Sequence, residues 1–532
     1  MKRHDGIREA WATRQAAAVA VAILVAVTVP LTARQQAAGD EEVAWRQLEA
    51  GRAFARQGNH TEALKDFRAV AQTHAATPAA DNALLEIARY FFNVALDPVE
   101  ADTAVTQILQ RYPTSDSAPE AYLISGQLAL ARSRQPGDLE AALANFDRVS
   151  RLFPRSDVVP RALQLAGHVY RLQGRLDLAL ASLARVAADH PGHAAGAQAY
   201  LEASLALVAK GDALAAMEEL QQVRNLWPGS REAEIALGRL ATLHRLYVRT
   251  RQGGSAYAFG ENLGPIKVDN LVGLAVAPSG SVYWAGENGL RLLSPPGDPP
   301  PTVARPRGLT TDATGRPVII EAGSIRPFGG EPLALSVPRS NGTPQPLQKI
   351  EGVVQLSNRA WIVADEDERT LHRFQSSGEH AGPFAQARTR RLAVNATDEV
   401  IGIDREQRGL VLFDAAGRMT GRLPARGTGY MLNNIEDVAF DVFGHLFVLD
   451  REGLAVFSPW QAAGTPAPAA PAARSGGQAA PEGRGAAYRL LTFYSEPEQS
   501  PGAFRRSTAL ALDASGAAYV YDARAERLRV YR

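Results

Sequence analysis

The spacing of apolar and polar residues changes twice along the chain. Residues 16–33 contain no charged residue, and over residues 41–249 apolar side chains recur at positions i, i+3, i+4 and i+7. That spacing is typical of amphipathic helices. Beyond it, short stretches of alternating apolar and polar residues are interrupted by Gly, Asp and Pro, which predicts β-strands. The pattern therefore predicts a helical domain at residues 34–249, a linker at residues 250–254 and a β domain at residues 255–532.

The first 33 residues have the layout of an export signal. Basic residues in the first 15 positions precede the uncharged run, which ends in small residues at Ala33. Cleavage after Ala33 would remove the run as a signal peptide. Because the run is about 18 residues long, at the low edge of a membrane-spanning helix, an uncleaved anchor formed by residues 16–33 is the alternative. Either form predicts an exported protein of the periplasm or cell envelope.

The helical region is built from a repeat. Three copies end at Pro154, Pro191 and Pro228, which are spaced 37 residues apart, and an earlier copy ending at Pro113 lacks the turn glycine. Each copy is expected to form two helices, because a glycine falls where the first helix must turn and a proline ends the unit. The spacing indicates about five units and a final capping helix.

This repeat resembles the tetratricopeptide repeat. The fullest copy carries six residues at the family's spacing: Gly167, Tyr170, Gly174, Ala179, Leu183 and Pro191. The 37-residue units are similar to those of exported bacterial envelope proteins such as outer-membrane assembly factors and the coordinator of the Tol–Pal system. Those assembly factors are lipoproteins, whereas this chain has no acceptor cysteine.

The resemblance implies a groove, lined by the first helix of each pair, that holds peptides or partner helices. The candidate partner-binding residues on these first helices are Tyr122, Gln127, Gln164 and His168. The alternative for the repeat tyrosines, Tyr122 among them, is that they only pack between helices.

The β region repeats a phrase six times: a short apolar strand, a turn, a second apolar strand that usually ends in an acid, and a third strand. This phrase resembles the blades of a six-bladed β-propeller of the NHL type. Radial repetition hides the strand edges that an open sheet would expose. Residues 256–259 are expected to complete the last blade and close the ring. Residues 461–487, rich in Ala, Pro and Gly, are predicted to be a disordered insertion.

Five acids end equivalent second strands of this repeat, and two roles are open to them. In NHL-type propellers such acids accept hydrogen bonds from turn amides, whereas in lactonase-like propellers acids near the channel hold a divalent ion. The acidic run Asp365–Glu368 lacks the alternating oxygen ligands and glycine turn of a calcium loop. We expect structural roles and no bound metal; the candidates if a metal is bound are Glu321, Asp365, Asp404, Asp450 and Asp522.

Composition narrows the function further. The chain has 532 residues, a net charge of +1 and no cysteine, which argues against a dedicated nucleic-acid binder and excludes disulfides and thiolate metal sites. It contains none of the common nucleotide-binding, serine hydrolase or zinc protease motifs. The sequence predicts a non-enzymatic envelope scaffold, without a cofactor, that binds partner proteins through the repeat groove and a propeller face. The alternative is a metal-dependent propeller hydrolase or lactonase with a helical docking domain.

Overall fold

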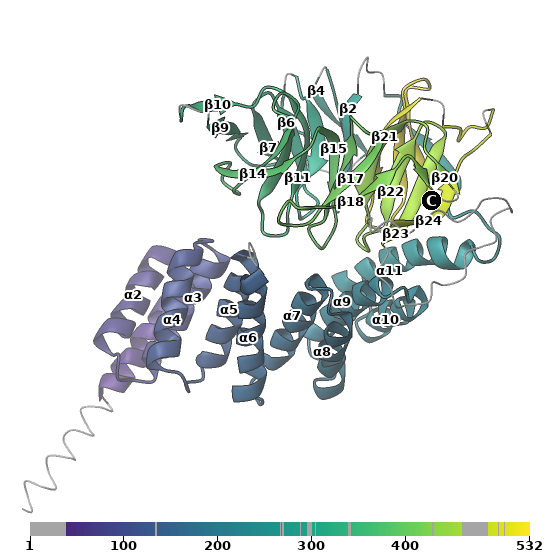
Figure 1. Cartoon of the computed structure of the whole chain (residues 1–532). Helices are drawn as coiled ribbons and strands as arrows, with labels where there is room; N and C mark the ends of the chain where they lie inside the picture. Colours follow the sequence, from purple (N-terminus) through teal and green to yellow (C-terminus); the bar gives the residue numbers. More distant parts are fainter. Residues whose placement is uncertain are drawn as a thin grey trace, which may run out of the picture. The chain divides into compact units, whose positions relative to one another are not determined.

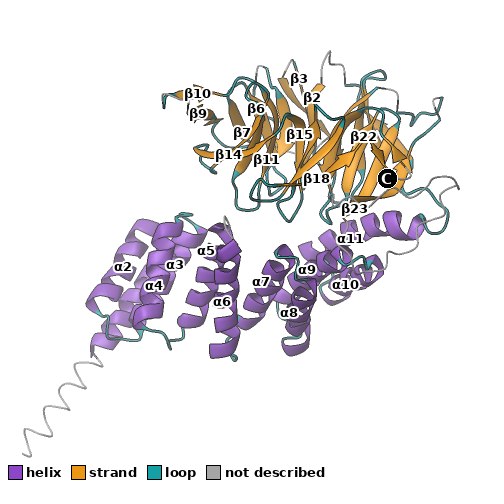
Figure 2. Cartoon of the chain, in the orientation of Figure 1, coloured by secondary structure: helices purple, strands orange, loops and turns teal. Residues whose placement is uncertain are grey.

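The computed structural model describes residues 39–532 except 133–135, 267, 269–270, 288, 295–299, 304, 339–341, 428–429, 460–487, 498 and 505. Helical repeats come first and a β-propeller follows, as the sequence predicts (Figures 1 and 2). The predicted export signal and the predicted insertion at 461–487 lie outside the described residues. Within the described part of the chain, no helix is both long and apolar enough to cross a membrane.

The described chain forms two compact units, and their boundary falls inside the helical repeats. The first unit holds the residues up to Ala129 together with Ala141–Ala162, and the second holds Leu130–Glu140 and Leu163–Arg532. Each unit therefore contains helical repeats, and the second also contains the propeller.

The first unit is a stack of antiparallel helix pairs. A helix over residues 39–56 pairs with α2, and later helices continue the stack: α2 His60–Thr73, α3 Ala79–Asn93, α4 Pro98–Arg111, α5 Ala118–Arg132 and α6 Pro136–Leu152. Phe67 and Phe146, on second helices, are almost fully buried. A Cβ added at Gly51 or Gly126 would lie within 2.6 Å of these rings, so a glycine is required for this close approach.

The second unit continues the repeats with five helices and a one-turn π-helix: α7 Val159–Leu172, α8 Leu176–Asp189, α9 Ala195–Ala209, α10 Ala213–Leu226, α11 Arg231–Leu243 and η1 His244–Arg249. The small residues Ala179 and Ala216, on the second helices α8 and α10, are fully buried, which fits a close approach of the paired helices. Turns at residues 250–253 then lead to the β region.

One turn keeps its shape without glycine. The first helix of a pair is followed by Gly58, Gly174 or Gly211 in the left-handed conformation, with φ between 72° and 86°. In the pair α3–α4 the same place, one residue before the helix N-cap Asp97, is taken by Leu96 with φ 54°. Leucine in this conformation is strained, and its side chain is 57% exposed.

The β region consists of small antiparallel sheets. Their strands are β2 Leu271–Val276, β3 Val282–Gly286 and β4 Gly289–Ser294; β5 Gly308–Thr311, β6 Pro317–Glu321, β7 Ser324–Pro327 and β8 Leu333–Ala334; β11 Ile350–Gln355, β12 Trp361–Asp365, β13 Thr370–Phe374 and β14 His380–Gln386; β15 Thr389–Val394, β16 Val400–Asp404, β17 Gly409–Phe413 and β18 Met419–Pro424; β21 Ile435–Phe440, β22 Leu446–Asp450, β23 Gly453–Pro459 and β24 Tyr488–Tyr494; β25 Ser507–Leu512, β26 Ala518–Asp522, β27 Arg527–Tyr531 and β1 Phe259–Leu263. Two short ribbons, β9 Ser336–Pro338 with β10 Pro344–Pro346 and β19 Arg426–Gly427 with β20 Tyr430–Met431, lie between blades in the sequence.

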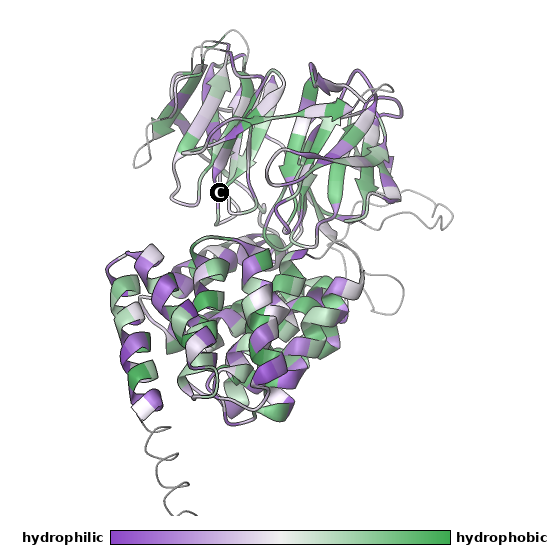
Figure 3. Cartoon of the chain, turned by 90° about the vertical axis from the view of Figure 1, so that its left-hand side faces the viewer, coloured by the Kyte–Doolittle hydropathy of each residue, from purple (hydrophilic) through white to green (hydrophobic). Residues whose placement is uncertain are grey.

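The first strands of the blades close a ring. β2, β5, β11, β15, β21 and β25 contact one another in this order, and β25 contacts β2. Six inner strands of the described chain thus form a propeller, and its strands carry many hydrophobic residues (green in Figure 3). Apolar clusters fill the space between neighbouring blades. Gly273 of β2 and Leu309 of β5 pair in parallel, which joins two blades into one seven-stranded sheet.

The two ends of the β region meet in one blade, but the closing strand differs from the predicted one. β1 begins at Phe259 and pairs with β27, whereas the sequence predicts this strand at residues 256–259. Tyr257 is instead fully buried, and its hydroxyl donates to the carbonyl of Gly516 at 2.8 Å. The ring of Tyr257 packs in an apolar cluster between blades. The closing strand β1 therefore begins after it, at Phe259.

Within the second unit, the last helices pack directly on propeller turns. Phe443, in the turn between β21 and β22, belongs to the same buried cluster as Leu243 of α11. The Thr242 hydroxyl donates to the carbonyl of Ser515 at 2.7 Å, and Tyr247 Oη lies 2.8 Å from His445 Nε2. These contacts fix the end of the helical stack on the β region.

Candidate functional site

The structure divides the four predicted groove residues between the two units. Tyr122 and Gln127 lie on α5 in the first unit and are half-buried, whereas Gln164 and His168 lie on α7 in the second. The ring centroids of Tyr122 and Phe153 lie 6.3 Å apart. Gln164 is buried, with 3% of its surface exposed. Tyr122 is therefore in contact with a neighbouring helix end and remains partly accessible, so both interpretations of this residue stay open.

Ion pairs join successive first helices in the first unit. Arg52 Nε lies 3.0 Å from Glu86 of α3, and Arg89 of α3 makes two hydrogen bonds to Glu120 of α5, at 2.7 and 2.5 Å. These bonds to Glu120 raise the pKa of Arg89. Because the ion pairs connect neighbouring repeats, they stabilise the stack. They also occupy side chains of the first helices, which are the helices expected to line a groove.

In the second unit, a buried charge cluster joins the first helices α7 and α9. Glu202 of α9 accepts a hydrogen bond from Arg171 Nε at 3.1 Å and lies 3.2 Å from His168 Nδ1. Burial works to raise the pKa of Glu202, but its contacts with His168 and Arg171 outweigh that effect and lower the pKa to about 2. His168 is therefore bound to a structural carboxylate.

A hollow of the first unit lies across α2, α3 and α4. It has a volume of about 320 Å³, and its apolar walls are buried side chains: Ala71, Leu84, Ile87 and Ala104. Its polar lining comes from α2 and α4, the second helices of two successive pairs: Arg68, Gln72, Glu100, Thr103, Gln107 and Arg111. Arg68 and Arg111 are exposed, and neither forms an ion pair within the described residues. This surface was not predicted from the sequence, because the resemblance to the tetratricopeptide repeat places binding on the first helices.

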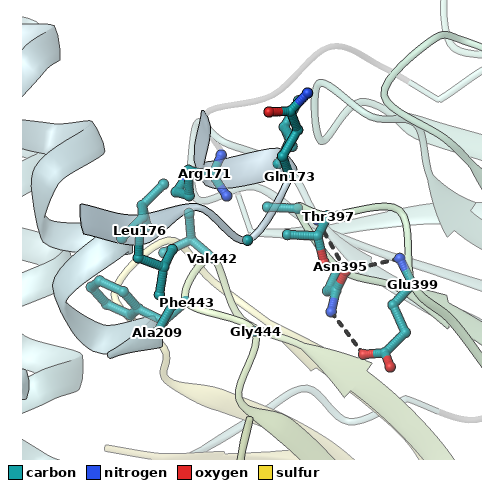
Figure 4. A pocket seen from close by; sticks show the side chains of 14 residues that line it. Arg171, Gln173, Leu176, Ala209, Asn395, Thr397, Glu399, Val442, Phe443 and Gly444 are labelled. Atoms are coloured by element: carbon teal, nitrogen blue, oxygen red, sulfur yellow. Dashed lines mark hydrogen bonds between the residues drawn. The ribbon is translucent and has the colours of Figure 1, made fainter. Parts of the chain in front are cut away.

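A second hollow lies within the second unit, where the α7–α8 turn and α9 meet two propeller turns (Figure 4). Its volume is about 400 Å³, and Arg171, Gln173, Asn395, Glu399 and Phe443 are among the residues that line it. A hollow of this size is within the range of small-ligand sites.

One wall of this hollow is a closed hydrogen-bond network. The side-chain oxygen of Asn395 accepts from the amides of Thr397 and Glu399, both at 3.0 Å, and its nitrogen donates to the Glu399 carboxylate at 3.1 Å. Tyr488 Oη donates to the same carboxylate oxygen at 2.6 Å. Burial raises the pKa of Glu399, which the bonds from Tyr488 and Asn395 partly offset. The polar groups of this wall thus bond to one another.

The five strand-end acids do not lie on the inner strands of the propeller. They end β6, β12, β16, β22 and β26, each the second strand of its blade. Asp450 accepts from the amides of Asn434 and Glu452, and Asp522 from those of Arg524 and Ala525. Asp365 accepts from the Asp367 amide and Asp404 from the amides of Glu406 and Gln407. Glu321 differs, because it accepts from the Ser324 hydroxyl and pairs with Arg326. Asp522 also pairs with buried Arg529 at 2.6 Å.

Sequence reasoning missed the turn residues that meet the helices. Asp441 and Asp513, like Asn395, accept amides two and four residues later in the chain. His445, which is fully buried, lies between Asp441 Oδ2 at 2.7 Å and Tyr247 Oη. The signal was present as an Asp or Asn five residues before four of the second strands, at Asp312, Asn395, Asp441 and Asp513. The helical residues that these turns contact are distant in sequence.

No protein-family model matches this chain, and no curated protein matches its sequence. Among solved structures, a crystal structure of MamA protein is 21% identical and covers 35% of this chain and 92% of its own, with a TM-score of 0.29. PilW, a type IV pilus biogenesis factor, is 17% identical over 38% of this chain and 86% of its own, with a TM-score of 0.32. A streptogramin B lyase is 9% identical over 52% of this chain and 97% of its own, with a TM-score of 0.34. At these identities and TM-scores the likenesses do not bear on function.

Proposed function

We propose that this chain is a non-enzymatic scaffold of the cell envelope that binds a partner protein through its helical repeats. The observation that carries the proposal is the hollow across α2, α3 and α4. Its buried apolar wall offers a site for an apolar side chain, and the exposed Arg68 and Arg111 offer positive charge to neighbouring carboxylates. The occupant is therefore a segment of a partner that carries an apolar residue beside acidic ones.

The pair α3–α4 has a second feature of a binding surface. Its turn exposes three apolar side chains: Val94 at 53%, Leu96 at 57% and Val99 at 72%. Exposed apolar groups that cluster in a turn are more typical of interaction surfaces than of a solvated loop. The propeller, whose ends pair in one blade, would offer a second rigid surface.

The alternative of a propeller hydrolase needs strand-end acids that are free to hold an ion near the channel. Asp450 and Asp522 are fully buried and accept backbone amides, which is the bonding expected of carboxylates that hold a blade together. No observation at these positions favours hydrolysis, and we retain the scaffold as the proposed function.

The binding surface is tested with a peptide library selected against the purified full-length protein. We expect the selected peptides to combine apolar and acidic residues. We expect R68E and R111E each to weaken binding at least about tenfold, because a reversed charge repels the peptide carboxylates. K65E is the matched control: it makes the same charge change on α2, at the exposed Lys65, which pairs with Glu62 and does not line the hollow.

Equal effects of R68E, R111E and K65E would show nonspecific attraction and would contradict the site. Peptide binding unaffected by R68E and R111E would place the surface elsewhere. The proposed envelope location is tested separately by fusing alkaline phosphatase after residue 40, because this enzyme is active only when it is exported. An inactive but stable fusion would overturn the location without affecting the binding result.

A further inference from the structure

Four consecutive acids, Asp365 to Glu368, lie at the end of β12 and in the turn to β13, and they differ in their ion-pair partners. Asp367 lies 3.0 Å from Lys349, and Glu366 pairs with Arg388 and Arg405. Asp365 and Glu368, in contrast, have no Lys or Arg partner within ion-pair distance in the described part of the chain. Asp365 is also buried, with 5% of its surface exposed. Asp365 accepts a hydrogen bond from the Asp367 amide at 3.0 Å, but no Lys or Arg neutralises its charge, so a cation beside it would be stabilised.

A buried histidine faces these two carboxylates. His372, on β13, has a side chain that is only 5% exposed, and its Nε2 makes no hydrogen bond. This nitrogen lies 3.3 Å from Glu368 Oε2. One ligand atom from each of Asp365, Glu368 and His372 can be chosen so that all three lie within 4.8 Å of one another. This imidazole nitrogen, whose near neighbour is a carboxylate of the same group, is thus part of a compact group of three possible metal ligands.

The other imidazole nitrogen of His372 already has a partner. His372 Nδ1 lies 3.3 Å from Nε2 of His380, the first residue of β14. When Nδ1 carries the proton and donates it to His380, Nε2 keeps a free lone pair that faces the carboxylates. Histidines that bind metals commonly donate their second ring N–H in this way, which fixes the tautomer and the ring orientation.

We propose that Asp365, Glu368 and His372 form a zinc site on the β12–β13 hairpin, with His380 as a positioning residue. One imidazole and two carboxylates match the nitrogen and oxygen ligands of Zn²⁺, whereas Ca²⁺ and Mg²⁺ prefer oxygen alone. Three protein ligands leave a fourth position for water or for a group from a partner. Glu368 is exposed, so the ion has a route from solvent. This site is at the end of a second strand and is independent of the proposed peptide surface.

The test is zinc binding to the full-length protein after treatment with a chelator. We expect isothermal titration with ZnCl₂, checked by elemental analysis after gel filtration, to give about one tightly bound Zn²⁺ per chain. D365N, E368Q and H372Q should each weaken binding at least about tenfold, and H380Q should weaken it about tenfold while the stoichiometry is kept. D367N is the matched control, because Asp367 lies in the same turn but pairs with Lys349.

Wild-type protein that binds Zn²⁺ no better than H372Q and E368Q would overturn the proposal. So would loss of binding in D367N equal to that in D365N, or binding of CaCl₂ in preference to ZnCl₂. Circular dichroism of each variant identifies misfolding. Because Glu368 is exposed in a turn, E368Q is expected to fold. Zinc binding to E368Q therefore decides the result even if D365N, which changes a buried residue, fails to fold.

Discussion

The strongest single-residue effect that the structure predicts belongs to Glu202. Its pKa is about 2 in the folded protein, against an ordinary value of 4.5. A carboxyl with a lowered folded-state pKa stabilises the fold above its ordinary pKa, and this contribution is lost as the pH falls through the folded-state value. We expect thermal unfolding, followed by circular dichroism at 222 nm, to show a loss of up to about 3 kcal/mol between pH 5 and pH 2.

The variant E202Q identifies the residue responsible. It removes the titrating group and leaves the buried Arg171 without its carboxylate, so it should lower stability by about 3–5 kcal/mol at pH 7 and flatten the pH dependence. E218Q, at an exposed position on the neighbouring α10, should change neither. A wild-type pH profile retained in E202Q would show that other carboxyls cause the acid loss.

Leu96 is a second residue at which a substitution is expected to change the stability of the fold, because its backbone has a strained left-handed conformation. Asparagine adopts the left-handed conformation at lower cost than leucine, and the exposed side chain gives up little buried area. We expect L96N to stabilise the protein by about 1 kcal/mol in thermal unfolding. V94N, two residues earlier and with φ −110°, removes a similarly exposed apolar side chain from an unstrained position and should give no gain. A destabilised L96N would mean that the leucine side chain, not its strain, dominates.

At the scale of elements, periodicity predicts most of what the structure contains. The helix pairs follow from the 37-residue spacing and their turn glycines, and the second strands follow from apolar runs that end in an acid. The closing strand is misplaced because Ala256 and Tyr257 have strand-like composition yet are buried as core. The π-helix at His244–Arg249 has no periodic signal, since its residues are set by packing against the propeller. Local pattern predicts an element, but tertiary packing sets its ends.

The approach of two strands gives a prediction at this scale. A Cβ added at Gly273 of β2 would lie 2.4 Å from the backbone nitrogen of Leu309 in β5, so the two blades would have to move apart. We expect G273A to destabilise the propeller by about 1–3 kcal/mol in urea unfolding followed by near-ultraviolet circular dichroism. G330A is the control, since its Cβ meets nothing closer than 3.4 Å. Equal stability of both variants would show that the parallel contact between β2 and β5 is not tight.

At the scale of the whole molecule, the contacts that join distant segments could not be predicted from the sequence. Thr242 bonds to Ser515, and Tyr247 contacts His445, across 273 and 198 residues of chain. The residues of the candidate hollow were missed for a related reason: Arg68 and Arg111 look like ordinary solvated positions until α2 and α4 are placed side by side. Among the proposed zinc ligands, the sequence indicated only the acids of the run Asp365–Glu368. His372 could not be recognised, because the hairpin and not a sequence motif brings it to the acids.

Closure of the ring by its own ends leads to a last prediction. Ala258 and Arg532 exchange two backbone hydrogen bonds, of 2.9 and 3.0 Å, which places their Cα atoms about 5.5 Å apart and within disulfide range. Because the chain has no cysteine, A258C with R532C creates a single defined pair. The oxidised bond should stabilise the propeller by about 2–4 kcal/mol over the reduced form in urea unfolding, since it closes a long loop in the unfolded chain. The pair A258C with R527C, at the far end of β27 and about 17 Å away, should not form a disulfide. Equal oxidation of both pairs, or failure of the first to oxidise, would contradict closure through β1 and β27.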